Sequence, residues 1–396
     1  MGRFLVLATL LGQCLGLVPN APFARPRGTG ARRLVVKSAL APVALSGAAR
    51  VARWAAPALV AAAASVIIKK RLDRPSRPYD RAANSVGREY DAWTREGILE
   101  YYWGEHIHLG WYTDEELSRG YLKKDFVEAK YNFTDRMMRW GGVLDARPEA
   151  GESCLKVLDV GCGIGGTTRY LANQLGADKA QVTGITLSPA QAQRAGELAK
   201  ERNVTNVEFK VMDALAMEFP AESFDVVWGC ESGEHMPDKG EYVREMTRVL
   251  KPGGKLVIAT WCQRDNSTQS FTAEEERSLD FLYSEWTHPY FISTNDYARL
   301  LGETKALENI AQDDWAKNTI ASWRHSIWVG VFDPWPVVFA GPRMWWKCLR
   351  DGICLERMHR AFDRGLMEYG MIKATKKPRP AAAPVAAAPA AAAPVA

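Results

Sequence analysis

The sequence predicts an α/β fold in which a doubly wound, mainly parallel sheet is flanked by helical regions. Residues 155–160 form a short apolar run that leads into a glycine-rich turn and then a helical pattern. Similar runs follow at 182–189, 209–219 and 224–236, separated by helical stretches, as repeated βαβ units require. The predicted regions are a core at 146–270, a helical lid at 79–145 and a helical cap at 271–377.

The glycine-rich turn after the first predicted strand is the strongest functional signal. Residues 156–166 read KVLDVGCGIGG. The glycines have no Cβ, so the backbone can approach a ligand closely, and the start of the next helix offers unpaired N–H groups. This form of the turn resembles the first motif of class I methyltransferases, which implies a Rossmann-like core and S-adenosylmethionine as cofactor. The predicted contacts here are Asp159, Gly161, Cys162, Gly163 and Gly165.

Three later strand ends supply the rest of the predicted cofactor site. The carboxyl ends of the strands in a doubly wound sheet line one crevice, where ligands bind. Thr186 stands where an acid usually holds the ribose, so this contact departs from the common pattern, and Gln191 is expected to assist. Asp213 is expected to face the adenine amino group. The predicted contacts from these segments are Thr186, Leu187, Gln191, Asp213, Ala214 and Cys230.

The composition argues against several other classes of function. The net charge of +5 arises from residues 1–74, which hold twelve Lys or Arg and one Asp, leaving −6 for the remainder. A folded region without basic excess lacks the charge that neutralises phosphates, so no nucleic-acid partner is expected. The seven cysteines form no CxxC pair, and neither metal-ligand spacing nor a phosphate-binding Lys-Ser/Thr pair occurs. We therefore expect reduced thiols and no metal.

Residues 1–50 have the composition of a targeting leader. Arg3 precedes an apolar run at 4–18, and residues 19–40 are rich in Arg and small residues without any acid. A signal sequence followed by a transit-like segment resembles the two-part leaders of algae whose plastids have additional membranes. Plastid targeting is therefore expected, and a secreted protein with a basic linker is the alternative.

A second apolar run, at 54–68, is followed by Lys69, Lys70 and Arg71. As a helix it would reach about 22 Å, short of a hydrocarbon core of about 30 Å unless flanking residues with snorkelling side chains are included. We expect residues 51–78 to be a membrane anchor and linker. An Ala-rich linker helix is the alternative. The Ala/Pro tail at 378–396 is expected to be disordered.

Longer segments on both sides of the glycine turn resemble one group of methyltransferases, those of tocopherol and plastoquinone synthesis. The segments are REYDAWTREGILEYYWGEHIHLGWY at 88–112, KDFVEAKYNFTDRMMRWGGV at 124–143, GITLSPAQ at 184–191, FDVVWGCESGEHMPDK at 224–239 and GLMEYGMIKA at 365–374. The resemblance extends over 79–376 and is strongest to the cyanobacterial-type 2-methyl-6-phytyl-1,4-benzoquinol methyltransferases. It implies a prenyl quinol as acceptor, methylated near a plastid membrane surface.

The acceptor chemistry has its own candidate residues. C-methylation of a hydroquinone requires that a phenol proton be removed or shared, and His or Glu are the usual agents near neutral pH. We expect His235 to act as the base and Glu231 as its orienting or cofactor-proximal partner, because their loop follows the fourth predicted strand. His108 is a further candidate, although its aromatic segment could form a lid by packing alone.

Other functions remain open from the sequence. The same cofactor could serve O-methylation of a chromanol such as γ-tocopherol, C-methylation of a sterol, or S-methylation of a small thioether acid such as methylthiohydroxybutyrate. A protein that binds the cofactor without catalysis is a further alternative. A long apolar acceptor groove would favour the prenyl quinol, and the many tryptophans of 271–377 are consistent with such a groove.

Overall fold

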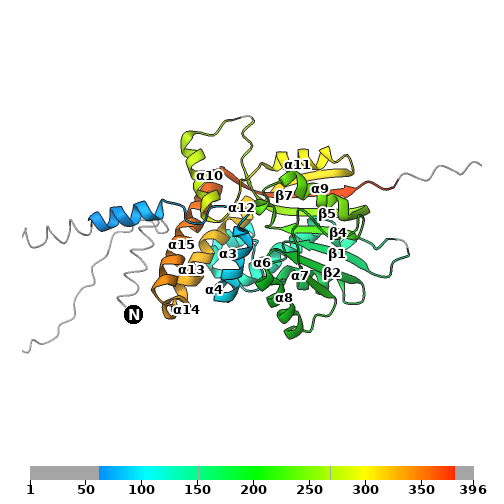
Figure 1. Ribbon diagram of the computed structural model, residues 1–396, viewed down its shortest axis with the longest axis horizontal. Helices are drawn as coiled ribbons and strands as arrows, with labels where there is room; N and C mark the ends of the chain where they lie inside the picture. The colour runs from blue at the N-terminus through cyan, green and yellow to red at the C-terminus, as the bar shows by residue number, and fades with distance from the viewer. Residues whose placement is uncertain (1–61, 150, 268, 380–396) are drawn as a thin grey trace, which may run out of the picture.

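The computed structural model describes residues 62–149, 151–267 and 269–379, and a seven-stranded sheet forms its centre (Figure 1). The strand order is β3-β2-β1-β4-β5-β7-β6. Strands β1 to β5 run parallel, and β7 is antiparallel to both of its neighbours. The strands are β1 (Leu155–Val160), β2 (Ala180–Thr186), β3 (Val207–Val211), β4 (Phe224–Cys230), β5 (Leu250–Gln263), β6 (Leu307–Asp314) and β7 (Met367–Lys376).

Helices cover both faces of this sheet, as the predicted doubly wound fold requires. Figure 1 shows α7 and α8 on one side of the strands and α9 and α11 on the other. Alternate strand residues enter two cores: Val157 packs with Met137 in one, and Leu158 packs with Tyr242 in the other. The helices next to the strands are α7 (Gly166–Leu175), α8 (Pro189–Glu201), η3 (Gly233–His235), α9 (Lys239–Val249) and α11 (Thr294–Glu303).

The predicted lid before the core is helical and is tied to the strand ends. Asp91 of α3 accepts hydrogen bonds from the Ser188 hydroxyl at 2.5 Å and the Ala190 N–H at 3.1 Å, at the start of α8. Glu105 pairs with Arg169 of α7. These contacts hold the lid over the carboxyl ends of the strands. Its elements are α3 (Ser85–Glu96), α4 (Ile98–Trp103), α5 (Asp114–Arg119), η1 (Tyr121–Lys123), α6 (Phe126–Trp140) and η2 (Val143–Asp145).

The region 271–377 differs from the expected helical cap because it also completes the sheet. Its strands β6 and β7 form an antiparallel pair, and β7 joins β5 over nine residue pairs, from Lys255↔Thr375 to Gln263↔Met367. Strand β7 is buried on both faces, so its apolar pattern lacks the alternation that marks a half-exposed strand. The helices of this region besides α11 are α10 (Ala273–Glu285), α12 (Ala316–Thr319), α13 (Ala321–Phe332), α14 (Trp335–Phe339) and α15 (Pro342–Asp363).

The predicted leader, residues 51–61 of the predicted anchor and linker, and nearly all of the tail lie outside the described residues. Residues 62–72 are helical, and Val66, Ile67 and Ile68 are exposed there. Within the described part of the chain, no helix is both long and apolar enough to span a bilayer. The chain then turns onto the cap, where Arg77 pairs with Glu285 of α10.

Candidate active site

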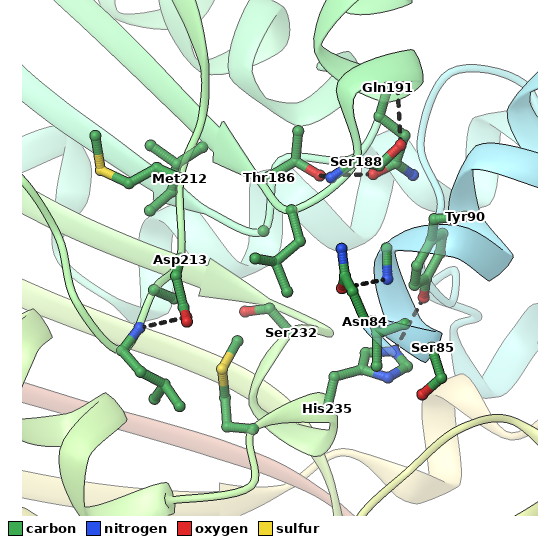
Figure 2. A pocket seen from close by; sticks show the side chains of 18 of the residues that line it. Asn84, Ser85, Tyr90, Thr186, Ser188, Gln191, Met212, Asp213, Ser232 and His235 are labelled. Atoms are coloured by element: carbon green, nitrogen blue, oxygen red, sulfur yellow. Dashed lines mark hydrogen bonds between the residues drawn. The ribbon is translucent and has the colours of Figure 1, made fainter. Parts of the chain in front are cut away.

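A cavity of about 250 Å³ opens at the carboxyl ends of β1 to β4, beneath the start of α3. Figure 2 shows the turn after β2, with Thr186, Ser188 and Gln191, on one side and the lid residues Asn84 and Tyr90 facing it. The predicted cofactor residues that line the cavity are Gly161, Gly163, Thr186, Leu187, Gln191, Asp213 and Ala214. The strand ends therefore bring together residues from three separate sequence segments.

The glycine turn has the shape that a closely bound ligand requires. Gly161 and Gly163 have φ values of 86° and 56°, in the left-handed region that side chains rarely adopt. A Cβ on Gly161 would lie 2.4 Å from the Cβ of Ser232, so this position has no room for a side chain. A Cβ on Gly163 would come no closer than 3.8 Å to its nearest neighbour, Gln191, and would reduce the space available in the cavity that Gly163 lines.

The turn after β2 presents an amide where related sites usually have an acid. The Thr186 hydroxyl donates to Oε1 of Gln191 at 2.8 Å, and the Ser188 N–H donates to the Thr186 hydroxyl at 3.2 Å. Gln191 is thereby held with its amide nitrogen toward Gly163. An amide N–H₂ group can donate to the ribose or carboxylate oxygens of a ligand, which gives the missing acid a chemical replacement.

Asp213 follows β3, and its Oδ1 accepts a hydrogen bond from the Leu215 N–H at 2.9 Å. This bond fixes the carboxylate at the edge of the cavity, next to Met212 and Ala214 (Figure 2). A fixed carboxylate can accept from an adenine amino group while apolar neighbours cover the ring faces. The arrangement therefore fits the predicted adenine contact.

Four predicted cofactor residues lie behind the cavity wall. Asp159 is buried and accepts from the Thr168 hydroxyl at 2.6 Å, and burial raises its pKa to about 7. The Cys162 side chain contacts its own turn through the Gly163 carbonyl. Gly165 lies under Phe209, where a Cβ would be 2.5 Å from a ring carbon. The last of the four is Cys230, which is buried at the end of β4. The structure gives these residues a supporting position rather than a place in the cavity lining.

A second cavity, of about 180 Å³, lies between the lid and the helices of the 271–377 region. Its walls are mainly aromatic and aliphatic side chains, including Trp93, Trp103, Trp261, Trp286 and Trp323. It meets the first cavity at four shared residues, which are Tyr90, Ile107, Glu231 and His235. A group held in the second cavity is therefore adjacent to a ligand in the first.

Several buried polar atoms in the second cavity have no hydrogen-bond partner among the residues that the structure describes. They include Nε1 of Trp286 and of Trp323, Oε1 of Glu234 and Nδ1 of His235. Neither ring nitrogen of His288 makes a hydrogen bond of normal geometry. Buried polar groups are almost always paired in native proteins, so such a cluster indicates a ligand with a polar head in an otherwise apolar site.

Glu231 has the most unusual environment at the junction of the cavities. Its φ of 49° is rare for a residue with a side chain, and such strain is common at functional sites. The Leu109 N–H and the Tyr369 hydroxyl both donate to Oε1, at 2.7 and 2.6 Å, which leaves Oε2 as the oxygen that can take up a proton. Burial, together with the nearby Glu234, raises the pKa of Glu231 to about 8.

His235 also lies at the junction, and its surroundings keep it neutral. Its Nε2 is 3.0 Å from the Tyr90 hydroxyl, and its ring stacks on His288 with centroids 4.5 Å apart. Burial, with a smaller contribution from the Lys239 charge, lowers the pKa of His235 to about 3. Burial thus makes the Glu231 carboxylate a stronger base and the His235 imidazole a weaker one, and these opposite directions favour Glu231 as the proton acceptor.

His108 lines neither cavity. It is buried between His106 and α6, its Nδ1 lies 2.8 Å from the Leu109 carbonyl, and burial lowers its pKa to about 4. The adjacent Leu109 N–H is the group that contacts Glu231. The structure thus gives His108 the packing role considered as the alternative, in support of the loop that holds Glu231.

Sequence reasoning missed most of the second cavity. Trp286, His288 and Trp323 come from a region in which aromatic residues are equally typical of a core, and nothing in their spacing separates the two uses. Tyr90, which lines both cavities, lies in the segment that the sequence predicts only as a lid. The available signals were the aromatic density of that segment and the tryptophans of 271–377.

Comparisons with known proteins agree with this geometry. A family model described as a methyltransferase domain matches residues 158–258. The 2-methyl-6-phytyl-1,4-hydroquinone methyltransferase of Synechocystis is 43% identical over 75% of this chain and 89% of the relative. The chloroplastic tocopherol O-methyltransferase of Arabidopsis thaliana is 36% identical over 71% of this chain and 82% of the relative.

Among solved structures, the geranyl diphosphate C-methyltransferase of Streptomyces coelicolor has a TM-score of 0.56 at 19% identity, with 76% of this chain and 100% of that chain covered. This likeness shows the fold. The curated relatives show that the chain belongs to the class I S-adenosylmethionine-dependent methyltransferases, in the family that includes the hydroquinone and tocopherol enzymes.

Proposed function

We propose that the protein methylates a ring carbon of a prenylated hydroquinone of the 2-methyl-6-phytyl-1,4-benzoquinol type, in tocopherol and plastoquinone biosynthesis. The observation that carries this proposal is the second cavity, which combines apolar walls with a few unpartnered polar atoms and meets the cofactor cavity at Glu231 and His235. A prenylated hydroquinone likewise combines a polar head, which can hydrogen-bond to these atoms, with an apolar tail that can pack against the walls.

S-adenosylmethionine supplies an electrophilic methyl group on a positively charged sulfur. The protein's part is to hold the quinol ring beside Glu231 and to manage its proton. As a carboxylate, Oε2 of Glu231 can take the proton of a ring hydroxyl, which raises electron density at the ortho carbon. That carbon forms the new bond to the methyl group as the methyl–sulfur bond breaks, with S-adenosylhomocysteine as the leaving group. The same carbon then loses its own proton and the ring oxygen regains one, which restores the aromatic hydroquinone with the net release of one proton. His235 and Tyr90 then act by positioning, because their mutual hydrogen bond fixes both side chains at the junction.

The charge of the second cavity disfavours a small anionic acceptor. Its lining includes five carboxyl side chains, which are Glu89, Glu96, Glu231, Glu234 and Asp351, against one amine, Lys347. That amine is already paired with Glu96. A thioether acid would place a further carboxylate here without a cationic partner, and burial of an unpaired charge is costly. A neutral quinol carries no such penalty.

We further propose that the protein works at an envelope or thylakoid membrane of a plastid. The composition of residues 1–50 and the name of the chloroplastic Arabidopsis relative support the plastid. The apolar run at 54–68, followed by three basic residues, supports contact with a membrane.

The proposal is tested by incubating the purified protein with labelled S-adenosylmethionine and a panel of acceptors. The panel contains 2-methyl-6-phytyl-hydroquinone, γ-tocopherol, a sterol and methylthiohydroxybutyrate, with identification of each product. We expect label on a ring carbon of the hydroquinone. Label on a chromanol oxygen, on a sterol or on sulfur, at a higher kcat/KM, would replace this proposal with the corresponding alternative.

A further inference from the structure

The helical tip formed by the end of α13, α14 and the start of α15 exposes an unusual number of large apolar side chains. We call residues 331–346 the aromatic tip. Phe339 is 81% exposed, Phe332 67%, Trp335 54% and Trp345 49%. Trp335 stacks on Phe339 with ring centroids 6.0 Å apart, and the Trp345 indole contacts the same short helix at the Val337 carbonyl. Apolar residues scattered singly over a surface need no explanation, but such a cluster marks a surface that a partner or a membrane covers.

The polar groups of the aromatic tip are largely satisfied within the protein. Asp333 and Arg343 are the only charged residues among its sixteen. The Tyr101 hydroxyl donates to the Asp333 carboxylate at 2.7 Å, and the Tyr102 hydroxyl donates to its backbone carbonyl. The Trp345 indole N–H donates to the Val337 carbonyl at 3.0 Å. The outer surface therefore offers ring faces and few charges.

The aromatic tip is continuous with the second cavity. Met344, Lys347 and Cys348 of α15 line that cavity. They lie within one helical turn of the exposed Trp345 and Trp346. Tyr102 of α4 also lines the cavity. A long apolar tail whose polar head lies near Glu231 can leave the cavity in this direction.

The N-terminal helical segment leaves the body from the same helix. The Arg350 side chain of α15 donates to the backbone carbonyls of Arg71 and Arg74. Figure 1 shows residues 62–72 projecting from the end of the molecule that carries α14 and α15, away from α8 and β2. Lys69, Lys70 and Arg71 are exposed there, directly after the apolar run at 54–68. Basic and aromatic side chains on one end of a protein are the groups that favour a lipid interface.

From these observations we infer that the aromatic tip inserts into the interfacial layer of a lipid bilayer and is the entry for the acceptor into the second cavity. The inference rests on the proposed function for the acceptor, and it concerns a surface separate from the predicted anchor at 54–68. Ring faces of Trp and Phe suit the interfacial layer. The aromatic tip thus lets a membrane lipid reach Glu231 without crossing water.

The test compares two presentations of one acceptor to the full-length protein. 2-Methyl-6-phytyl-hydroquinone is offered in vesicles of phosphatidylcholine and phosphatidylglycerol, or dispersed in detergent. The variants are Phe339→Asp and Trp335→Asp, neither of which lines a cavity. Leu144→Asp is the matched control, because Leu144 is 43% exposed in η2 and lies outside both cavities and the aromatic tip.

We expect each aromatic-tip variant to lose at least roughly tenfold in kcat/KM with vesicles and to stay within about twofold of wild type in detergent, since one buried aromatic contributes about that much. The control should follow wild type in both. The inference would be overturned if the ratio of kcat/KM with vesicles to kcat/KM in detergent were the same for wild type, the control and the aromatic-tip variants. Equal losses of kcat/KM in detergent and in vesicles would give that result too. A dimer in solution that only the aromatic-tip variants abolish would assign the surface to a second copy instead.

A second measurement tests whether the aromatic tip contacts lipid without depending on the methylation reaction. Vesicles with brominated acyl chains should quench tryptophan emission of the full-length protein, and Phe339→Asp should reduce that quenching while Leu144→Asp does not. If wild type methylates no quinol in either form, the proposed function fails, yet this quenching still decides whether the aromatic tip contacts lipid. Unchanged quenching in Phe339→Asp would contradict the contact.

Discussion

The two cavities of this methyltransferase are built in different ways. The cofactor cavity consists of strand ends and the turns that follow them, so short sequence motifs carry most of its residues. The second cavity is assembled from α3, α4, the loop after β4, the end of α10 and two helices near the C-terminus. The first is held by the backbone of the sheet, and the second by packing between side chains that are far apart in the sequence.

Because of this difference, substitutions in the two cavities should have different effects on ligand binding. A change in the cofactor turn should alter binding of one ligand through backbone shape. A change in the second cavity should alter the acceptor alone, because its walls meet the cofactor cavity only at Tyr90, Ile107, Glu231 and His235. Substitutions at the junction should affect the reaction itself.

The largest effect is expected from Glu231→Gln, at the junction. Loss of the carboxylate removes the proposed base, so the single-turnover rate at saturating ligands should fall by roughly 10²–10⁴-fold. The affinity for S-adenosylhomocysteine, measured by calorimetry, should change little, because this product has no charge on sulfur. A greater rate loss in His235→Ala than in Glu231→Gln would return the base role to His235.

Gly163→Val should weaken cofactor binding by roughly 100-fold or more while the protein still folds, because the side chain would project into the cavity. Gly253→Val is the matched control: Gly253 also has a positive φ, of 79°, and no atoms near its missing Cβ. Both variants should lose similar stability in thermal unfolding. Near-normal affinity in Gly163→Val, measured by calorimetry, would remove this turn from the cofactor site.

Trp286→Phe tests whether a substitution in the second cavity changes acceptor binding and leaves cofactor binding unchanged. It removes an unpartnered indole N–H with a modest change in volume, so KM for the acceptor should rise about three- to tenfold, the value of one hydrogen bond. The dissociation constant of the cofactor should stay within twofold. Trp228→Phe is the control, because the Trp228 N–H is also unpartnered but lies in the core, outside both cavities. Equal KM changes in both variants would indicate a general packing effect.

The smallest effect concerns pH and Glu234, whose pKa burial raises to about 7. Between about pH 4.5 and 7 the folded protein keeps the proton of Glu234 while the unfolded chain loses it. The free energy of unfolding therefore falls as pH rises through this range. Glu234→Gln removes that loss, and Gln can still accept the bond from the Thr260 hydroxyl. The variant should gain about 2–4 °C in Tm over wild type at pH 8 and less at pH 5. A constant difference across this range would contradict the raised pKa.

The fold and the cofactor cavity could be predicted because their signals are local. The glycine turn and Asp213 follow strands whose apolar runs are visible in the sequence, and Thr186 ends another such strand. Parallel strands bring these ends to one edge of the sheet. The strand pair of β6 and β7 was missed since β7 is buried on both faces and has no simple alternation.

Apart from Glu231 and His235, the second cavity could not be predicted because its residues meet only after folding. His288 stacks on His235 across 53 positions of sequence, and Tyr369 reaches Glu231 across 138. The roles proposed for Glu231 and His235, in the ESGEH segment after β4, also depend on how deeply each side chain is buried. The same desolvation lowers the pKa of His235 and raises that of Glu231, and composition alone carries no information on which group is desolvated.

A crystal structure with S-adenosylhomocysteine and a prenylated hydroquinone bound together would test most directly whether the two cavities hold cofactor and acceptor. We expect the adenosyl group in the first cavity beside Gly163 and Asp213, and the quinol ring in the second cavity with a hydroxyl at Glu231. The tail should extend past Met344. A quinol ring bound outside the second cavity, or one whose hydroxyls contact neither Glu231 nor His235, would contradict this assignment of the cavities.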